Sequence, residues 1–129
     1  MMPRTREWLR KAESDRRVVR LAMCAQPPEY DAACFHCQQA VEKHLKGLLH
    51  ERGQPVPKTH DLIDLVDRLL PSDPQLKPLR TTAGRLTIYA VLYRYPGFHA
   101  TKQRAQTACK TMEPVRAEIR RRLGLRPRP

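Results

Sequence analysis

Arg94 and His99 are the residues whose types and spacing most directly suggest chemistry in this sequence. Four residues separate them in the segment LYRYPGFH, residues 92–99. A guanidinium can hold a phosphate through two N–H bonds, and an imidazole titrates near neutral pH and can move a proton. Together they could cleave a phosphodiester, with His99 as the base on a ribose 2′-OH and Arg94 on the developing negative charge. The alternative is that Arg94 anchors the turn through a carboxylate and that His99 is an ordinary surface residue.

Cys34 and Cys37 form a C-x-x-C pair within CFHCQQAVEKHLK, residues 34–46, which suggests zinc or redox chemistry. Structural zinc needs four converging ligands, but no second pair with this spacing is present. The further ligands would have to come from Cys24, Cys109, His36 or His44. Because cysteine is often buried in ordinary cores, we expect helix packing here, with no metal and no cofactor. The five glycines are scattered singly, which argues against a glycine-rich phosphate loop.

The positive charge is concentrated in the second half of the chain. Residues 1–70 carry 12 Lys and Arg against 10 Asp and Glu, a net charge of +2, whereas residues 71–129 carry 13 against 3, or +10. This asymmetry indicates a polyanion or an acidic protein as partner; the alternative is a basic surface that serves solubility alone.

Apolar residues at three- and four-residue spacing predict an all-α fold, an up-and-down bundle of four or five helices in a single domain. The expected helices span residues 3–25, 30–52, about 60–70, about 76–93 and about 101–123. Thr59 is the expected N-cap of the third helix, and Pro114 predicts a kink or a break in the last one. The tail, residues 124–129, is expected to fray.

The chain has no predicted signal peptide and no apolar run of the roughly 20 residues that cross a bilayer. We therefore expect a cytoplasmic protein without a membrane partner, whose cysteines stay reduced.

Four sequence pieces together resemble the HEPN domain, in its small prokaryotic form. They are WLRKAESD (residues 8–15), FHCQQAVEKHLKGLL (35–49), KTHDL (58–62) and RYP (94–96), in this order. The resemblance covers about residues 5–123 and implies a helical bundle that pairs as a homodimer and associates with nucleotides or RNA. It also implies a possible partner protein, a minimal nucleotidyltransferase, in a pair of the toxin–antitoxin type.

The same resemblance implies a role for Arg94 and His99. Active HEPN ribonucleases carry an Arg followed by four to six residues and a His, and two copies form one metal-independent site. Arg94 and His99 match that spacing, whereas Tyr95 and the Pro96-Gly97 turn depart from it and make the segment more similar to the nucleotide-binding branch of the family.

Three hypotheses follow, and the basic second half has a part in each. The leading one is a nucleotide- or RNA-binding HEPN protein, with phosphates held in a groove by Arg80, Arg85, Lys102 and Arg104 near Arg94. The second is an endoribonuclease toxin that uses Arg94 and His99. The third is a non-catalytic module whose basic surface binds the transferase partner by charge complementarity.

Overall fold

The chain is all-helical over residues 1–126, the part that the computed structural model describes. Five α-helices and three short 3₁₀ turns follow one another, and no strand occurs in this range. The helices and turns are α1 Pro3–Cys24, α2 Tyr30–Glu51, α3 Leu62–Leu69, η1 Pro74–Leu76, α4 Lys77–Gly84, η2 Thr87–Ala90, η3 Leu92–Arg94 and α5 Lys102–Arg122. The predicted all-α bundle is confirmed.

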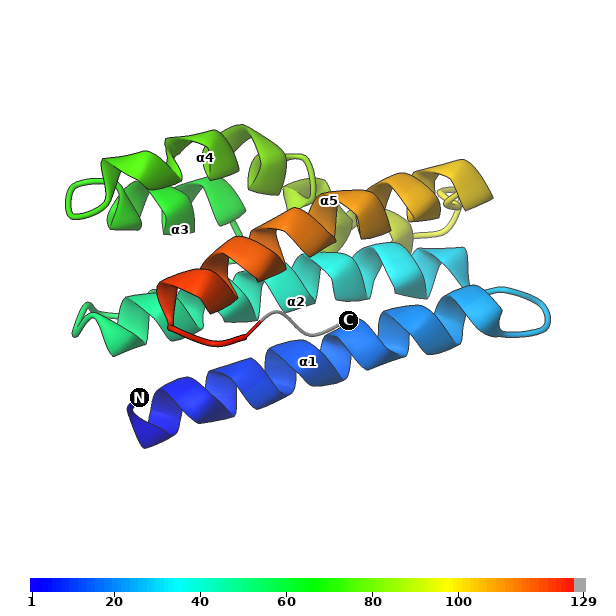
Figure 1. The fold of residues 1–129 in the computed structure, drawn as a ribbon. Helices are drawn as coiled ribbons and strands as arrows, with labels where there is room; N and C mark the ends of the chain where they lie inside the picture. The colour runs from blue at the N-terminus through cyan, green and yellow to red at the C-terminus, as the bar shows by residue number, and fades with distance from the viewer. Residues whose placement is uncertain (127–129) are drawn as a thin grey trace.

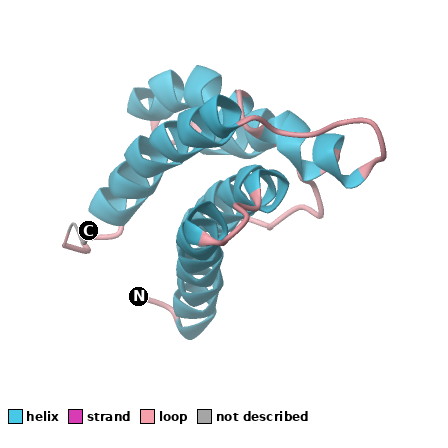
Figure 2. Ribbon diagram, turned by 90° about the vertical axis from the view of Figure 1, so that its right-hand side faces the viewer, coloured by secondary structure: helices cyan, strands magenta, loops and turns pink. Residues whose placement is uncertain are grey.

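Helix α2 is the centre of the bundle, with α1 along one side and α5 along another. Helices α1 and α2 run in opposite directions, whereas α2 and α5 run in the same direction (Figure 1). The shorter α3 and α4 form a pair beside α5, and the view in Figure 2 separates this group from the α1–α2 pair. The start of α2 therefore lies at the same end of the bundle as η2, η3 and the start of α5.

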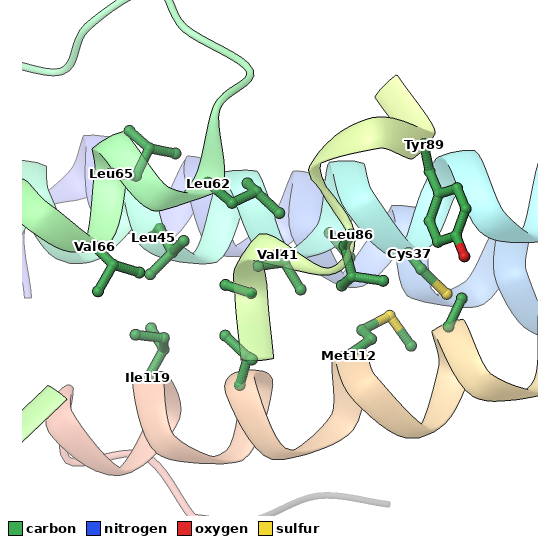
Figure 3. Close-up of a cluster of buried hydrophobic side chains, with 14 of the residues drawn as sticks. Cys37, Val41, Leu45, Leu62, Leu65, Val66, Leu86, Tyr89, Met112 and Ile119 are labelled. Carbon is green, nitrogen blue, oxygen red and sulfur yellow. The ribbon is translucent and has the colours of Figure 1, made fainter. Parts of the chain in front are cut away.

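The hydrophobic core fills the space between α2, α3 and α5 (Figure 3). Leu45, Val66 and Ile119 lie towards one end of it, and Cys37 and Met112 lie towards the other. All five side chains are almost completely buried. Because these residues recur every three or four positions on their helices, each helix presents one continuous apolar face to the core.

The start of the third helix differs from the prediction. Asp61, and not Thr59, is the N-cap of α3, where its carboxylate accepts a hydrogen bond of 3.0 Å from the Ile63 N–H. Thr59 makes a tighter local turn, since its hydroxyl oxygen accepts from the Asp61 N–H at 3.1 Å. An aspartate is at least as good a cap as a threonine, so the cap moves two residues forward.

The predicted fourth helix, about residues 76–93, is wrong in its second half. Helix α4 ends at Gly84, and the chain continues through the two 3₁₀ turns η2 and η3. Glycine has a low helix propensity, and the β-branched Thr87 and Ile88 follow it. An added Cβ at Gly84 would lie 2.9 Å from Ile63, so the glycine also permits the close approach of α4 to α3.

Helix α5 runs without a break from Lys102 to Arg122 with Pro114 inside it, so the expected break at this proline does not occur. Beyond the helix, the Leu125 N–H donates to the Arg120 carbonyl at 2.9 Å. Arg120 in turn donates to the Arg126 carbonyl at 3.0 Å. The rest of the tail that was expected to fray, residues 127–129, lies outside the described part. Among the described helices, none is long and apolar enough to cross a membrane.

Candidate nucleotide- and RNA-binding site

A hollow of about 400 Å³ lies where the first turns of α2 face η2 and η3. We call it the aromatic hollow; its main lining residues are Asp31, Phe35, His36, Tyr89, Tyr93 and Arg94. Three aromatic rings, a guanidinium, an imidazole and a carboxylate therefore face one space. Aromatic faces can stack on a base, and a guanidinium can hold a phosphate, so the hollow combines the two kinds of group that a nucleotide needs.

Helix α2 and the 3₁₀ turns position the aromatic groups. The rings of Tyr89 and Tyr93 are stacked, with centroids 5.6 Å apart and an interplanar angle of 18°. The Phe35 and His36 rings meet edge to face at 5.1 Å. His36 is further oriented by Asp15, because its Nδ1 lies 2.8 Å from the Asp15 carboxylate on α1.

Arg94 is exposed and lies at the end of η3, with its guanidinium carbon 5.9 Å from the centroid of the Phe35 ring. This is a cation–π contact. Among residues 1–126 no carboxylate forms an ion pair with Arg94, so the alternative in which Arg94 anchors the turn through a carboxylate is wrong. A guanidinium held against an aromatic face keeps its N–H groups available to an anion.

A carboxylate does anchor this turn, but it binds the backbone at Ala100, after the turn, and not Arg94. Asp31, in the first turn of α2, accepts a hydrogen bond of 2.6 Å from the Ala100 N–H. Its other oxygen lies 3.7 Å from His99 Nδ1, and the His99 side chain is 81% exposed. Asp31 also lines the aromatic hollow beside Arg94. Asp31 is thus a common neighbour of Arg94 and His99, and no hydrogen bond joins these two side chains within the described residues.

Arg104 lines a second hollow of about 370 Å³, on the other side of Tyr89, together with Thr101, Gln103 and Thr107. Thr101 caps α5 by accepting a hydrogen bond of 3.1 Å from the Arg104 N–H. Burial, together with the neighbouring Tyr89, raises the pKa of Tyr93, so its phenol stays protonated at neutral pH and can donate a hydrogen bond. Tyr89 lines both hollows, and each hollow also contains one exposed arginine.

The other predicted phosphate ligands lie at different places. Lys102 is exposed at the first position of α5, near Arg104, and Arg85 is exposed at the end of α4. Arg80 lies on α4 and forms an ion pair of 2.8 Å with Asp67. Neither Arg80 nor Arg85 lines the two hollows.

Four residues of the aromatic hollow were not predicted as site residues from the sequence: Asp31, Phe35, Tyr89 and Tyr93. The i,i+4 spacing of Tyr89 and Tyr93 was a visible signal, because it puts two rings on one face of a helical turn. The contribution of α2 had no such signal, since Asp31 and Ala100 are 69 residues apart in the chain.

The C-x-x-C pair is part of the core. Cys34 and Cys37 are fully buried on α2, as the packing interpretation predicted, and Cys109 on α5 lies within hydrogen-bond reach of Cys37. Burial raises the pKa of the Cys34 thiol to about 12, and a hydrogen bond with Cys109 and burial raise that of Cys37. Both groups are therefore unreactive thiols. Among the described residues, no three His, Cys, Asp or Glu side chains are grouped so that they could hold a metal ion.

The fold and the motifs define a small helical domain of one family: the HEPN domain matches residues 5–122, and the chain belongs to it. Among solved structures, TT1696 from Thermus thermophilus superposes with a TM-score of 0.81 at 29% sequence identity. The alignment covers 93% of this chain and 98% of that one. None of the curated proteins matches the sequence.

Proposed function

We propose that this HEPN protein binds nucleotides or single-stranded RNA at the aromatic hollow, as one component of a toxin–antitoxin-like pair with a nucleotidyltransferase. The observation that carries the proposal is the exposed Arg94 guanidinium above the Phe35 ring, beside the stacked Tyr89 and Tyr93. A base would stack on the rings, and Arg94 would hold its phosphate. Arg104 in the adjoining hollow would hold the next phosphate, and Lys102 and Arg85 would add long-range attraction.

The test is the affinity for a fluorescein-labelled single-stranded RNA, measured by fluorescence anisotropy. Replacing Arg94 or Arg104 by Gln should weaken binding about tenfold or more, because each change removes a charge-assisted hydrogen bond worth about 1.5–3 kcal/mol. Arg80→Gln is the matched control, since Asp67 already holds that guanidinium; it should change affinity by less than about threefold. Equal losses in all three variants would contradict binding at this hollow.

A second candidate function is metal-independent cleavage of RNA by Arg94 and His99. What favours it is Asp31, which lies 3.7 Å from His99 and lines the hollow that contains Arg94. His99 would take the proton of a ribose 2′-OH, the 2′-oxygen would attack phosphorus, and the bond to the 5′-oxygen would break, with that oxygen taking up a proton from water. Arg94 would stabilise the added negative charge on the phosphate oxygens. The product ends would be a 2′,3′-cyclic phosphate and a 5′-hydroxyl.

Cleavage is tested with total RNA in EDTA, beside an Arg94→Ala/His99→Ala double variant. Wild-type cleavage that leaves cyclic phosphate ends, and that the double variant lacks, supports the nuclease. RNA that stays intact at the highest wild-type concentration rules it out while leaving the binding proposal untouched.

We also propose that two copies pair across this face. Ile88, Val91, Tyr95 and Phe98 are large apolar side chains that are 50–62% exposed, and they flank Arg94 and His99 in the chain. An exposed apolar cluster of this kind is typical of a protein interface, and a second copy would bury it. Light scattering after gel filtration should show a dimer for wild type and a monomer for Val91→Ser/Phe98→Ser. A monomeric wild type would contradict the pairing.

A further inference from the structure

A third hollow, also basic, is lined by residues of α1 and by residues at and just beyond the end of α5. The start of α1 and the end of α5 lie at the same end of the bundle (Figures 1 and 2). The volume of this third hollow is about 690 Å³, larger than the aromatic hollow, and the two share no lining residue. Arg6, Arg10 and Arg17 of α1 and Arg120 of α5 line it, with Leu9 and Leu125 as apolar neighbours. We call it the α1 hollow.

The charge of the α1 hollow is strongly positive. Glu13 is its one acidic lining residue, and both Arg116 and Arg120 already hold that carboxylate. Although partial burial opposes ionisation, the hydrogen bonds and charge of Arg116 keep the pKa of Glu13 below its ordinary value. Glu13 is therefore ionised and neutralised by its own partners. Arg6, Arg10 and Arg17 are exposed and form no ion pair with the acidic residues of the described chain, so their charge is available to a ligand.

The spacing of these arginines indicates the shape of the ligand. At 100° per residue, Arg6, Arg10 and Arg17 fall within about 40° of one another around α1, and they extend over about 16 Å along it. Three guanidiniums spread over this length suit several phosphates in a row better than one phosphate. Guanidinium groups bind phosphate oxygens through paired N–H bonds, and Leu9 and Leu125 offer apolar contact to a ribose or a base.

We propose that the α1 hollow binds the phosphate backbone of single-stranded RNA, as a second contact distinct from the aromatic hollow. The proposal rests on the proposed function, since it requires that the chain binds RNA. It adds that the strand is held at two places, and that the arginines along α1 supply affinity without sequence preference by contacting its phosphates. The separations of four and seven residues place the guanidiniums about 6 and about 10 Å apart along α1, and a flexible single strand can follow both steps. A nucleic-acid strand is favoured over an acidic protein as the occupant, because the proposed function already requires one.

The test compares two double variants of α1 that lose the same charge. Arg10→Gln/Arg17→Gln removes two guanidiniums of the hollow, whereas Arg4→Gln/Lys11→Gln removes two exposed cations centred roughly 130° away around the helix. The readout is the anisotropy of a fluorescein-labelled 20-nucleotide RNA titrated at several salt concentrations. We expect the Arg10/Arg17 variant to bind about tenfold or more weakly and its salt slope to fall by about 1.4, since each lost phosphate contact is worth about 0.7 for a single strand. The Arg4/Lys11 variant should keep the wild-type slope.

The outcomes separate the two proposals. If both double variants bind like wild type while Arg94→Gln is weakened, the α1 hollow is not an RNA contact and the proposed function stands. If wild type binds no RNA, the proposed function fails and this inference fails with it. Unlabelled poly-glutamate is the competitor that tests the other occupant. If it displaces the labelled RNA as effectively as unlabelled RNA does, and if the Arg10/Arg17 variant binds neither the poly-glutamate nor the RNA, the hollow is a docking site for an acidic protein and the inference is overturned.

Discussion

Glu42 is the residue whose replacement tests the interior of this bundle most sharply. Its side chain on α2 is nearly buried, with the residue 4% exposed. One oxygen accepts from Lys46 Nζ at 2.9 Å, and the other accepts from Gln38 Nε2 at 3.1 Å and lies 2.8 Å from His60 Nδ1. Although burial opposes ionisation, these hydrogen bonds lower the pKa of Glu42. The carboxylate is thus the common partner of an ammonium, an amide and an imidazole.

Replacing Glu42 by Met should cost about 3–5 kcal/mol of unfolding free energy, because it leaves the Lys46 ammonium buried without its carboxylate. Lys46 is itself only 6% exposed, and its remaining contact is the Trp8 ring at 5.8 Å, worth about 1 kcal/mol. Gln38 is less affected, since its amide also donates to the His60 carbonyl at 3.1 Å. The Glu42→Met/Lys46→Met double variant leaves no buried charge without a partner, and its free energy of unfolding should be within about 1 kcal/mol of that of wild type.

The assay is urea unfolding followed by far-UV circular dichroism at pH 7, with Asp64→Asn as control. Asp64 and Arg68 form the same i,i+4 kind of pair at 3.1 Å, but both side chains are substantially exposed, so the control should lose less than about 1 kcal/mol. Because the pKa of Glu42 is lowered in the fold, its contribution is present above the unfolded pKa and is lost as pH falls through the folded one. A single variant as stable as the control, or a double variant less stable than Glu42→Met, would refute the reasoning.

Three further predictions concern other contacts within the fold. Burial lowers the pKa of His44 to about 4, so as pH falls from about 6.5 the unfolded chain takes up a proton before the folded one, and the free energy of unfolding should drop by about 3 kcal/mol between pH 6.5 and 4. Urea unfolding of His44→Gln should depend less steeply on pH over this range. A variant with the pH dependence of wild type would contradict this role of His44. Gly84→Ala should lower the free energy of unfolding by about 1–2 kcal/mol, because the added methyl group clashes with Ile63, and by less in an Ile63→Ala background. Equal losses in the two backgrounds, measured by urea unfolding, would show that there is no clash. Asp31→Ala removes the acceptor of the Ala100 N–H, so it should lower stability by about 1 kcal/mol or more and speed hydrogen exchange at that amide; exchange as slow as in wild type would show that Asp31 does not hold the turn.

The long helices were predictable because their signal is repeated. The apolar residues of α2, from Cys34 to Leu49, return every three or four positions over most of its length, and no local alternative competes with such a pattern. The segment from Gly84 to Arg94 lacks that repetition. Its glycine and β-branched residues indicate a weak helix. The choice of two 3₁₀ turns depends on packing against α2 and on the Leu62 N–H, which donates to the Thr87 hydroxyl at 3.2 Å.

The candidate site was predictable only in part, for the same physical reason. Arg94 and His99 were visible as a pair, since four residues separate them in the chain. Asp31, which lies 3.7 Å from His99 and lines the hollow that contains Arg94, belongs to a helix more than sixty residues earlier, and only tertiary packing brings it there. Phe35 likewise gave no local signal of a site, because only tertiary packing places its half-buried ring under Arg94.

The most direct test of the account is a titration of the ¹⁵N-labelled protein with a short single-stranded RNA, followed by ¹H–¹⁵N correlation spectra. We predict saturable shifts of the amides of Phe35, His36, Tyr93 and Arg94, lost in the Arg94→Gln variant apart from any shifts along α1. The account would be contradicted if these amides stayed unshifted at saturating RNA, or if the only shifts lay around Arg80 and Asp67 on the α3–α4 pair.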